Sequence, residues 1–335
     1  MLSESPPLIT IKRAPSSTAS ESSLPDNPPF FNHATLYFED GSVIIMPNDS
    51  TTIFCVHRSL VSAHSAVLRE MCIQAERTSQ ELFRGRLLIR MPDAFDDLET
   101  LFNIMYDGIR LPLQAEAAGF PYISSAFRMA TKYGLAGERA IIIENMPPQW
   151  GIFPPTDRHF RSRWYTEPHP ADIISLLREC DYSPVDLLEA LYYKLSILTF
   201  PSTESIIEDH FRHLSQTDID NFTVSCIRLR TEYTSSISYP PHTINDCPNV
   251  HCQLTLLGFW TQVAVPHLLA RPNMARPVEA WFELESMLER VCAVRRPGQD
   301  QGAACVDCKS ALGAYIALNG HTMKAAVRTC FFASA

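Results

Sequence analysis

The chain has 335 residues, of which 46% are hydrophobic and 19% are charged, and its formal net charge at pH 7 is −9. This length and composition predict about two globular domains, each able to bury its own core. Proteins that bind nucleic acid cluster Lys and Arg against the phosphates. The densest basic stretch, Arg158 to Arg163, holds only three arginines between proline-rich flanks, so we expect a solvated linker there and no nucleic-acid partner.

Two further classes are disfavoured by the hydropathy pattern. No apolar stretch approaches the ~20 residues that cross a bilayer, and the first residues lack the basic and then apolar pattern of a secretory signal. We therefore expect a soluble protein of the cytoplasm or nucleus with no membrane partner. In such a reducing compartment the ten cysteines are expected to remain thiols, which pack in the core or bind metal.

Residues 1–28 are rich in Ser and Pro and poor in large apolar side chains, which predicts a disordered tail. Residues 30–146 read as mixed strand and helix. Leu36 to Phe38 leads into Asp40-Gly41, a strong hairpin signal, and Ser42 to Met46 is the expected return strand. A third strand is predicted over Thr52 to Val56, which is rich in β-branched and aromatic residues.

Helices and one more strand complete this first half. Apolar spacing of 3, 4 and 3 predicts a helical face at Val61, His64, Leu68 and Met71, and again at Phe95, Leu98, Phe102 and Met105. Leu87 to Ile89 reads as a strand, and Asp93 is the expected cap of the helix that follows it. Two further helices are predicted, one ending at Gly134 and one over residues 137–145.

Residues 147–170 hold six prolines and no clean periodicity, which predicts a linker. Its four large aromatic residues are expected to pack it against a neighbour; they are Trp150, Phe153, Phe160 and Trp164.

The region 171–335 is predicted to be helical. Pro184, after Ser183 as a cap, opens a stripe of Leu188, Leu191 and Leu195, and Ser215 with Asp218 resembles a capping box. A further stripe after Pro277 contains Val278, Trp281, Leu284, Leu288 and Val291. Core packing is the simplest interpretation of these stripes.

Three stretches in the first half resemble a known family. They are His33 to Val43, Phe54 to Leu60 with its Val56-His57-Arg58, and Ser65 to Met71. Together they resemble the BTB/POZ domain in the form common in mushroom-type (basidiomycete) fungal proteins, over residues 30–146. The second half resembles, more weakly, the helical extension that follows this domain in those proteins. The implied fold class is α+β, with a short mixed sheet flanked by helical hairpins and then a mainly α-helical C-terminal region.

The resemblance implies a binding platform, since family members form homodimers, link substrates to cullin-type ubiquitin ligases, or act in transcription regulation. We therefore expect a non-enzymatic protein-interaction module whose partners are other proteins, a second copy or a cullin. The alternatives are a substrate adaptor for a cullin-type ligase and a zinc-containing transcription regulator. Phe102, Met105 and Tyr106 are candidate partner-binding residues, with core packing as the other interpretation, and His57 is expected to join strand to helix.

No motif indicates catalysis. The sequence lacks a Walker loop, a Gly-rich dinucleotide turn, a G-x-S-x-G elbow and an H-E-x-x-H helix. The carboxylate pairs Asp96-Asp97 and Glu283/Glu285 lie on predicted amphipathic helices, where a solvated face explains them. We expect no catalytic residues, although an enzyme within residues 170–335 remains an alternative.

The cysteines offer one candidate site. Cys305 and Cys308 have the spacing that lets two thiolates bind one metal ion, and Cys247 with Cys252 forms a looser second pair. Together they predict one structural zinc, with His251 or Cys292 as a substitute ligand. The other interpretation is four ordinary thiols and no cofactor. A redox C-x-x-C role is less favoured, because the surrounding pattern lacks the strand-to-helix setting of thioredoxin-type proteins.

Overall fold

The computed structural model describes residues 30–78, 82–109, 111–146, 148–151, 153, 168–200, 210–211, 213–238, 240–242, 247–293 and 304–332. The predicted tail and two linker aromatics, Phe160 and Trp164, lie outside these residues. Internal contacts divide the chain into two compact units, Met1–Met146 and Pro147–Ala335. None of the helices in the described ranges has the length and apolar character needed to cross a membrane.

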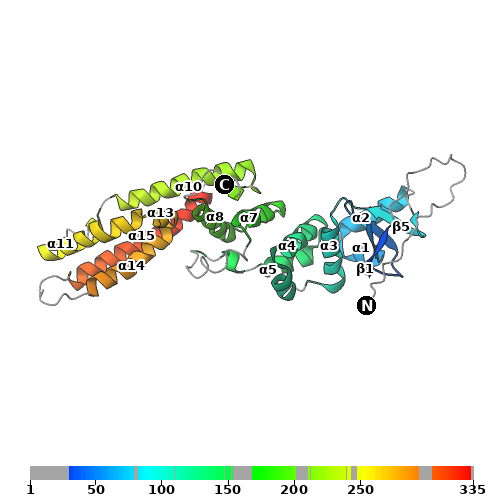
Figure 1. Cartoon of the computed structure of the whole chain (residues 1–335), viewed down its shortest axis with the longest axis horizontal. Coiled ribbons are helices and arrows are strands. Elements are labelled where there is room, and N and C mark those ends of the chain that lie inside the picture. Colours follow the sequence, from blue (N-terminus) through cyan, green and yellow to red (C-terminus); the bar gives the residue numbers. More distant parts are fainter. Residues whose placement is uncertain are drawn as a thin grey trace, which may run out of the picture. The chain divides into compact units, whose positions relative to one another are not determined.

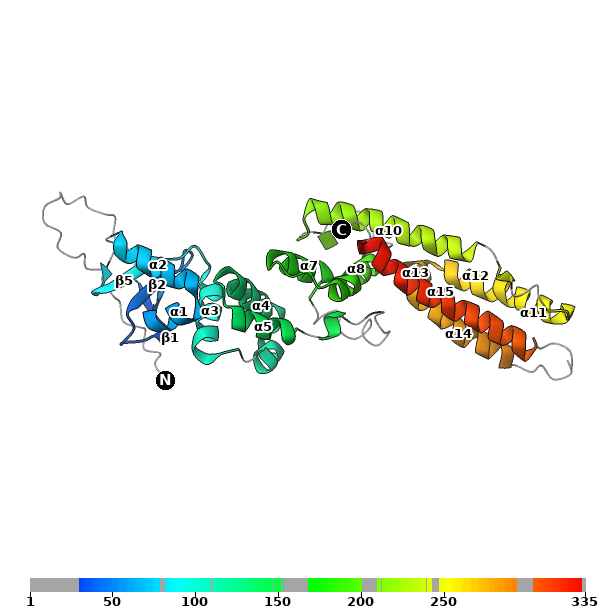
Figure 2. The same ribbon diagram turned by 180° about the vertical axis from the view of Figure 1, so that it is seen from behind.

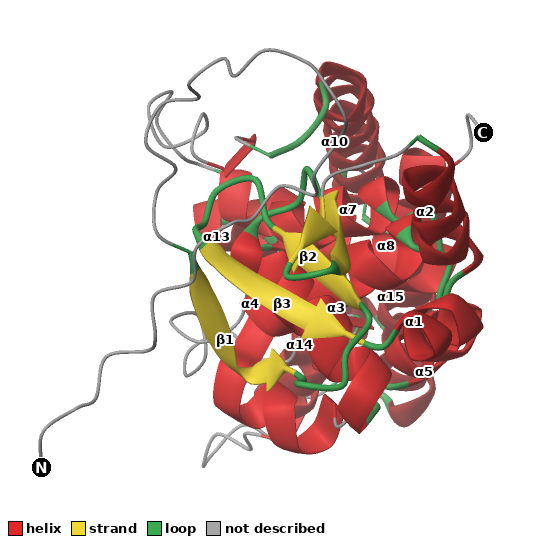
Figure 3. Ribbon diagram, turned by 90° about the vertical axis from the view of Figure 1, so that its right-hand side faces the viewer, coloured by secondary structure: helices red, strands yellow, loops and turns green. Residues whose placement is uncertain are grey.

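The first unit is a mixed α/β structure built on a small sheet, drawn in yellow in Figure 3. The sheet has five strands in the order β1-β3-β2-β5-β4. Its elements are β1 Phe31–Tyr37, β2 Val43–Met46, β3 Thr52–Val56, α1 Arg58–His64, α2 Ala66–Arg77, β4 Leu82–Phe83, β5 Arg86–Arg90, α3 Phe95–Asp107, α4 Leu111–Lys132 and α5 Ala136–Glu144.

The hairpin of this sheet differs from the predicted one. β2 pairs antiparallel with β3, whereas β1 runs parallel to β3 on its other side, so the strands flanking Asp40-Gly41 are not neighbours. The chain does turn there, with the Gly41 amide donating to the Phe38 carbonyl at 3.1 Å. A Cβ at Gly41 would lie 2.7 Å from the Cys55 Sγ, so only glycine lets this turn cross the end of β3.

Both faces of the sheet are covered, which explains why β2 is apolar throughout and buried at all four positions. On one face Ile44 and Cys55 belong to a cluster with Phe83 and Leu88. The other face carries an aromatic stack, in which the ring of Phe54 lies 5.3 Å from the ring of Phe102. Phe95 and His33 extend this stack.

His57 lies where β3 passes into the first helix, as the sequence predicts. It occupies the N-cap position of α1 without capping it by its side chain. Its amide donates to the Tyr106 hydroxyl at 2.8 Å, and its Nδ1 lies 2.9 Å from the same oxygen. One phenol on α3 therefore holds the strand-to-helix junction, which is a structural role.

The predicted helix after His57 is two helices. Its apolar stripe crosses a break at Ser65, which ends α1 and caps α2 by accepting from the Leu68 amide at 3.0 Å. The Ser65 hydroxyl also donates to the Tyr133 carbonyl at 2.6 Å. A buried serine thus ties the helical hairpin to the end of α4.

The cap of α3 also differs from the prediction. The Phe95 amide donates to the Oδ1 of Asp49 at 2.8 Å, and not to Asp93. Asp93 is buried and instead binds Lys132 and accepts from the Tyr133 hydroxyl. The carboxylate therefore joins the start of α3 to the end of α4.

The second unit is helical (Figures 1 and 2). Its elements are η1 Pro148–Gly151, α7 Pro170–Glu179, α8 Val185–Thr199, α10 Gln216–Ile237, α11 Val250–Phe259, the π-helical turn η3 Trp260–Ala264, α12 Val265–Leu269, α13 Arg271–Ala275, α14 Pro277–Ala293 and α15 Val306–Phe332.

Aromatic side chains fill the core of this unit. Trp260 and Trp281 are buried with ring centroids 6.2 Å apart, and Tyr315 meets both rings edge-on. Near the end of α15, Phe331 stacks on Tyr192 with centroids 5.6 Å apart.

Of three sequence predictions for this unit, two are confirmed and one is wrong. Trp150 is buried and its carbonyl accepts from Lys194 on α8, so the described part of the linker packs as expected. Ser215 caps α10, accepting from the Asp218 amide at 3.1 Å. The N-cap of α8 is Pro184, whereas Ser183 accepts from Arg178. Ser183 is therefore not the predicted cap.

Replacing the buried carboxylate at Asp93 tests the packing of the first unit. Asp93→Ala leaves the Tyr133 hydroxyl and the Lys132 ammonium without their partner, and we expect a loss of about 2–4 kcal/mol of unfolding free energy. The measurement is urea unfolding followed by circular dichroism.

The matched control is Asp107→Ala, an exposed carboxylate at the end of α3, for which a change within about 0.5 kcal/mol is expected. All four tryptophans belong to the second unit, so the fluorescence transition should not move in either variant. Equal effects of the two substitutions on the unfolding free energy would contradict the structural role assigned to Asp93.

Candidate metal centre

Four cysteines from two distant segments converge in the second unit. Cys247 precedes α11 and Cys252 lies in its first turn, whereas Cys305 precedes α15 and Cys308 lies in its first turn. Asn249 caps α11, its Oδ1 accepting from the His251 amide at 3.0 Å. Helix α11 therefore begins between the two cysteines of the looser pair and brings both to one end.

The geometry is compact. The four Sγ atoms all lie within 4.8 Å of one another, and the Cys252 and Cys305 sulfurs are 3.8 Å apart. Four thiolates around one tetrahedral ion, at about 2.3 Å each, have sulfurs about 3.8 Å apart. The cluster of Cys247, Cys252, Cys305 and Cys308 thus fits the first coordination sphere of a metal ion without a change of fold.

Backbone donors also point at the sulfurs. The Cys305 amide donates to the Cys252 Sγ at 3.4 Å, and the Cys308 amide donates to the Cys305 Sγ at 3.5 Å. The bond from the Cys308 amide lowers the pKa of the Cys305 thiol. Burial raises the pKa of Cys252, and the neighbouring Cys305 thiol raises that of Cys308. The thiols share protons as a group, as expected for four sulfurs in one place.

The cluster has a buried side and an exposed side. Cys247 and Cys252 are buried, Cys308 is partly buried and Cys305 lies at the surface. His251, one predicted substitute ligand, is exposed and not part of the cluster. The side chain of Cys292, the other substitute, lies outside the described residues.

The three predicted partner-binding residues lie elsewhere than expected. Phe102 and Met105 are buried inside the first unit, so the prediction that they line a groove is wrong. Both lie on the buried side of α3. The 3, 4, 3 spacing that drew attention to them is the spacing of a helical face packed against the core. Tyr106 is partly buried, and its hydroxyl is bonded to His57.

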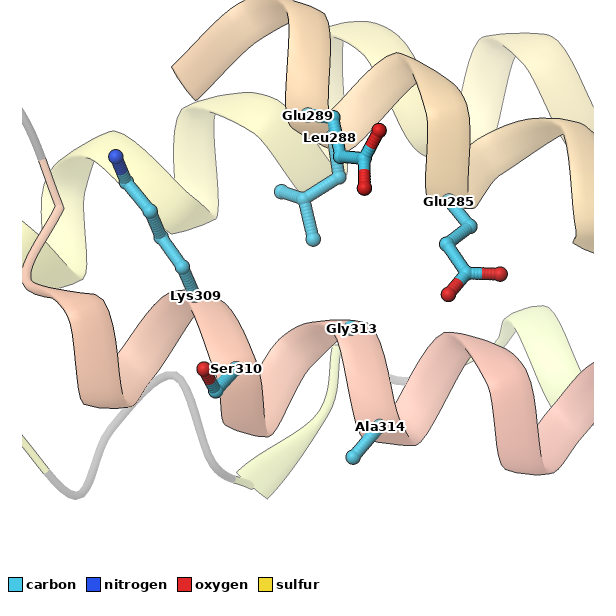
Figure 4. Close-up of a pocket in the computed structure, with 7 residues that line it drawn as sticks. All are labelled: Glu285, Leu288, Glu289, Lys309, Ser310, Gly313 and Ala314. Atoms are coloured by element: carbon cyan, nitrogen blue, oxygen red, sulfur yellow. The ribbon is translucent and has the colours of Figure 1, made fainter. Parts of the chain in front are cut away.

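Asp97 and Glu283, one from each carboxylate pair, have structural partners. Asp97 accepts from the Ser125 hydroxyl, and Glu283 pairs with His267 at 3.4 Å and Arg276 at 3.8 Å. Glu285 lines a surface hollow of about 550 Å³ between α14 and α15 (Figure 4). The lining residues are Glu285, Leu288, Glu289, Lys309, Ser310, Gly313 and Ala314. None of them is a thiol or an imidazole.

Sequence reasoning missed a buried polar pair in the second unit. Tyr193 on α8 donates to the Oε2 of Glu279 on α14, and its oxygen accepts from the Val278 amide at 3.1 Å. The Glu279 Oε1 makes no hydrogen bond within the described part of the chain. Burial raises the pKa of Glu279 to about 6. The two partners are 86 residues apart, and no local pattern joins them.

Comparisons with known proteins leave this geometry as the guide to function. The chain matches no protein-family model, no curated protein and no solved structure.

Substituting Glu279 tests the raised pKa. A carboxyl that titrates near 4.5 when unfolded and about 6 when folded binds more protons in the folded state between these values. Its stabilisation is complete below about pH 4.5 and is lost as the pH rises through 6. Glu279→Gln should therefore gain up to about 2 kcal/mol of stability relative to the parent between pH 4.5 and 8.

Urea titrations followed by tryptophan fluorescence at both pH values measure this difference. Glu289→Gln, an exposed position on the same helix, is the control and should show no pH-dependent difference. A Glu279→Gln effect that is the same at both pH values would contradict the raised pKa.

Proposed function

We propose that this chain is a non-enzymatic protein-interaction protein. In this proposal its first unit is a BTB/POZ-like domain that binds other polypeptides. Its second unit is a helical extension whose end is held together by one structural zinc ion.

The junction at His57 is the observation that carries the first part. A β-hairpin passes there directly into a helical hairpin, and two further strands and then helices follow, which fits the short mixed sheet and helical hairpins that the resemblance implies. The fold also offers surfaces for a partner. Strand β1 lies at an edge of the sheet, and edge strands present unpaired backbone groups. Val67, Leu82 and Ile141 are exposed apolar side chains of this unit.

The thiol cluster supports the second part. Four thiolates in tetrahedral reach of one ion favour Zn²⁺, which has no geometric preference of its own and binds sulfur well. Such a site is closed and leaves no position for a substrate, so its effect is on stability. Zinc would join the starts of α11 and α15, although 53 residues separate Cys252 from Cys305.

Metal analysis of the purified protein tests the zinc site. We expect one zinc per chain, and removing it should lower the stability of the second unit by about 4 kcal/mol if zinc is present at a thousand times its dissociation constant. Tryptophan fluorescence reports this unit alone, because all four tryptophans lie in it.

Two serine substitutions make this test specific. Cys252→Ser should lose the zinc, whereas Cys330→Ser, a buried thiol outside the cluster, should keep it. A protein that is free of metal after growth and purification with zinc would refute the site.

Self-association tests the interaction function. We expect sedimentation velocity to show a concentration-dependent dimer. The combined substitution Val67→Glu, Leu82→Glu and Ile141→Glu should raise the dissociation constant of the dimer about tenfold or more, because charges then replace exposed apolar side chains of the first unit. The control combines Val224→Glu, Ile227→Glu and Leu318→Glu, which are more exposed apolar side chains of the second unit.

A chain that stays monomeric and retains no purified partner, or equal loss in both triple variants, would contradict the proposal. A purified cullin retained by the parent and not by the first-unit variant would narrow the function to a ligase adaptor. The net charge of −9 disfavours the alternative of a DNA-bound regulator.

A further inference from the structure

In the part of the chain that the structure describes, the thiol cluster has one exposed cysteine. Cys247 and Cys252 are buried, Cys308 is partly buried, and Cys305 lies at the surface just before α15. Its neighbour Val306 is 77% exposed, and Asp307 is exposed as well. Of the four sulfurs, that of Cys305 is therefore the one that a small oxidant meets first.

Local geometry provides Cys305 with a partner within the same helical turn. Cys308 follows three residues later, its amide donates to the Cys305 Sγ at 3.5 Å, and its sulfur lies within 4.8 Å of that atom.

We propose that Cys305 and Cys308 form a reversible disulfide when hydrogen peroxide oxidises the cluster, and that this releases the metal ion. The proposal rests on the zinc site proposed above. It makes the site a redox-sensitive modification site as well as a cross-link.

The chemistry balances in two steps. The Cys305 thiolate attacks one peroxide oxygen, so that an S–O bond forms, the O–O bond breaks and hydroxide leaves. The Cys308 thiolate then attacks the Cys305 sulfur, so that the S–S bond forms, the S–O bond breaks and a second hydroxide leaves. Each sulfur loses one electron and peroxide gains two. Only Cys247 and Cys252 remain as ligands, too few to hold the ion.

The disulfide does not replace the cross-link that the metal ion makes between the starts of α11 and α15. A bond between residues three apart closes a small loop at the start of α15 and constrains little of the chain. The metal, by contrast, joins segments 53 residues apart. Oxidation should therefore free the start of α11 from the start of α15. A disulfide between Cys252 and Cys305, whose sulfurs are 3.8 Å apart, would instead preserve the tie.

Peroxide titration of the full-length, zinc-loaded protein tests the proposal. A metallochromic dye measures released zinc, and differential alkylation with peptide mapping identifies the disulfide. We expect one zinc released per Cys305–Cys308 disulfide. Alkylation of Cys247 and Cys252 should become about tenfold faster after oxidation, because they are then uncovered. Dithiothreitol with added zinc should restore the starting state.

A control variant and the possible outcomes distinguish the redox proposal from the zinc site on which it rests. Cys330→Ser should release zinc as the parent does, since this thiol lies outside the cluster. Mapping Cys252–Cys305 as the product, or finding no disulfide at peroxide excess, would overturn the redox pair even if zinc is bound. Protein without zinc would refute the metal site, while the peptide map would still show whether Cys305 and Cys308 pair.

Discussion

The sulfurs of Cys252 and Cys305 lie 3.8 Å apart although 53 residues separate them, and the end of the second unit depends on that approach. Helix α11 must begin directly after Asn249, and α15 directly after Cys305, for the four thiols to meet. Between these segments lie the helices that contribute Trp260 and Trp281 to the core. The same packing that buries the indoles therefore sets the distance between the thiol pairs.

The first unit depends on polar ties of a different kind. Tyr106 holds the His57 junction, Ser65 joins the helical hairpin to Tyr133, and Asp93 joins α3 to α4. Each tie satisfies buried or partly buried hydrogen-bonding groups, and a fully buried one would cost about 1–3 kcal/mol if left alone. They orient the helices on the sheet, and the surface left outside them includes the edge strand and the exposed apolar side chains on which the proposed interaction rests.

Two of the wrong predictions for the first unit have a common cause. Asp40-Gly41 and Asp93 each carry a strong local signal, one for a hairpin and one for a cap. In the structure, β3 inserts between β1 and β2, and Asp49 takes the capping place. Gly41 is required by its contact with Cys55, and Asp93 by Lys132 and Tyr133. Local patterns cannot show partners that are far away in the chain.

The sequence by itself determined where most strands and helices lie, because an apolar period of 2 or 3.6 reflects which side of an element is buried. It also marked Cys247, Cys252, Cys305 and Cys308 as candidate ligands, since paired thiols carry their chemistry in their spacing. Only the tertiary structure decided that these two pairs meet, that Phe102 and Met105 are core, and that Tyr193 binds Glu279. The reason is physical: contacts between distant segments follow from how whole helices and strands pack, and no short window of residues contains that information.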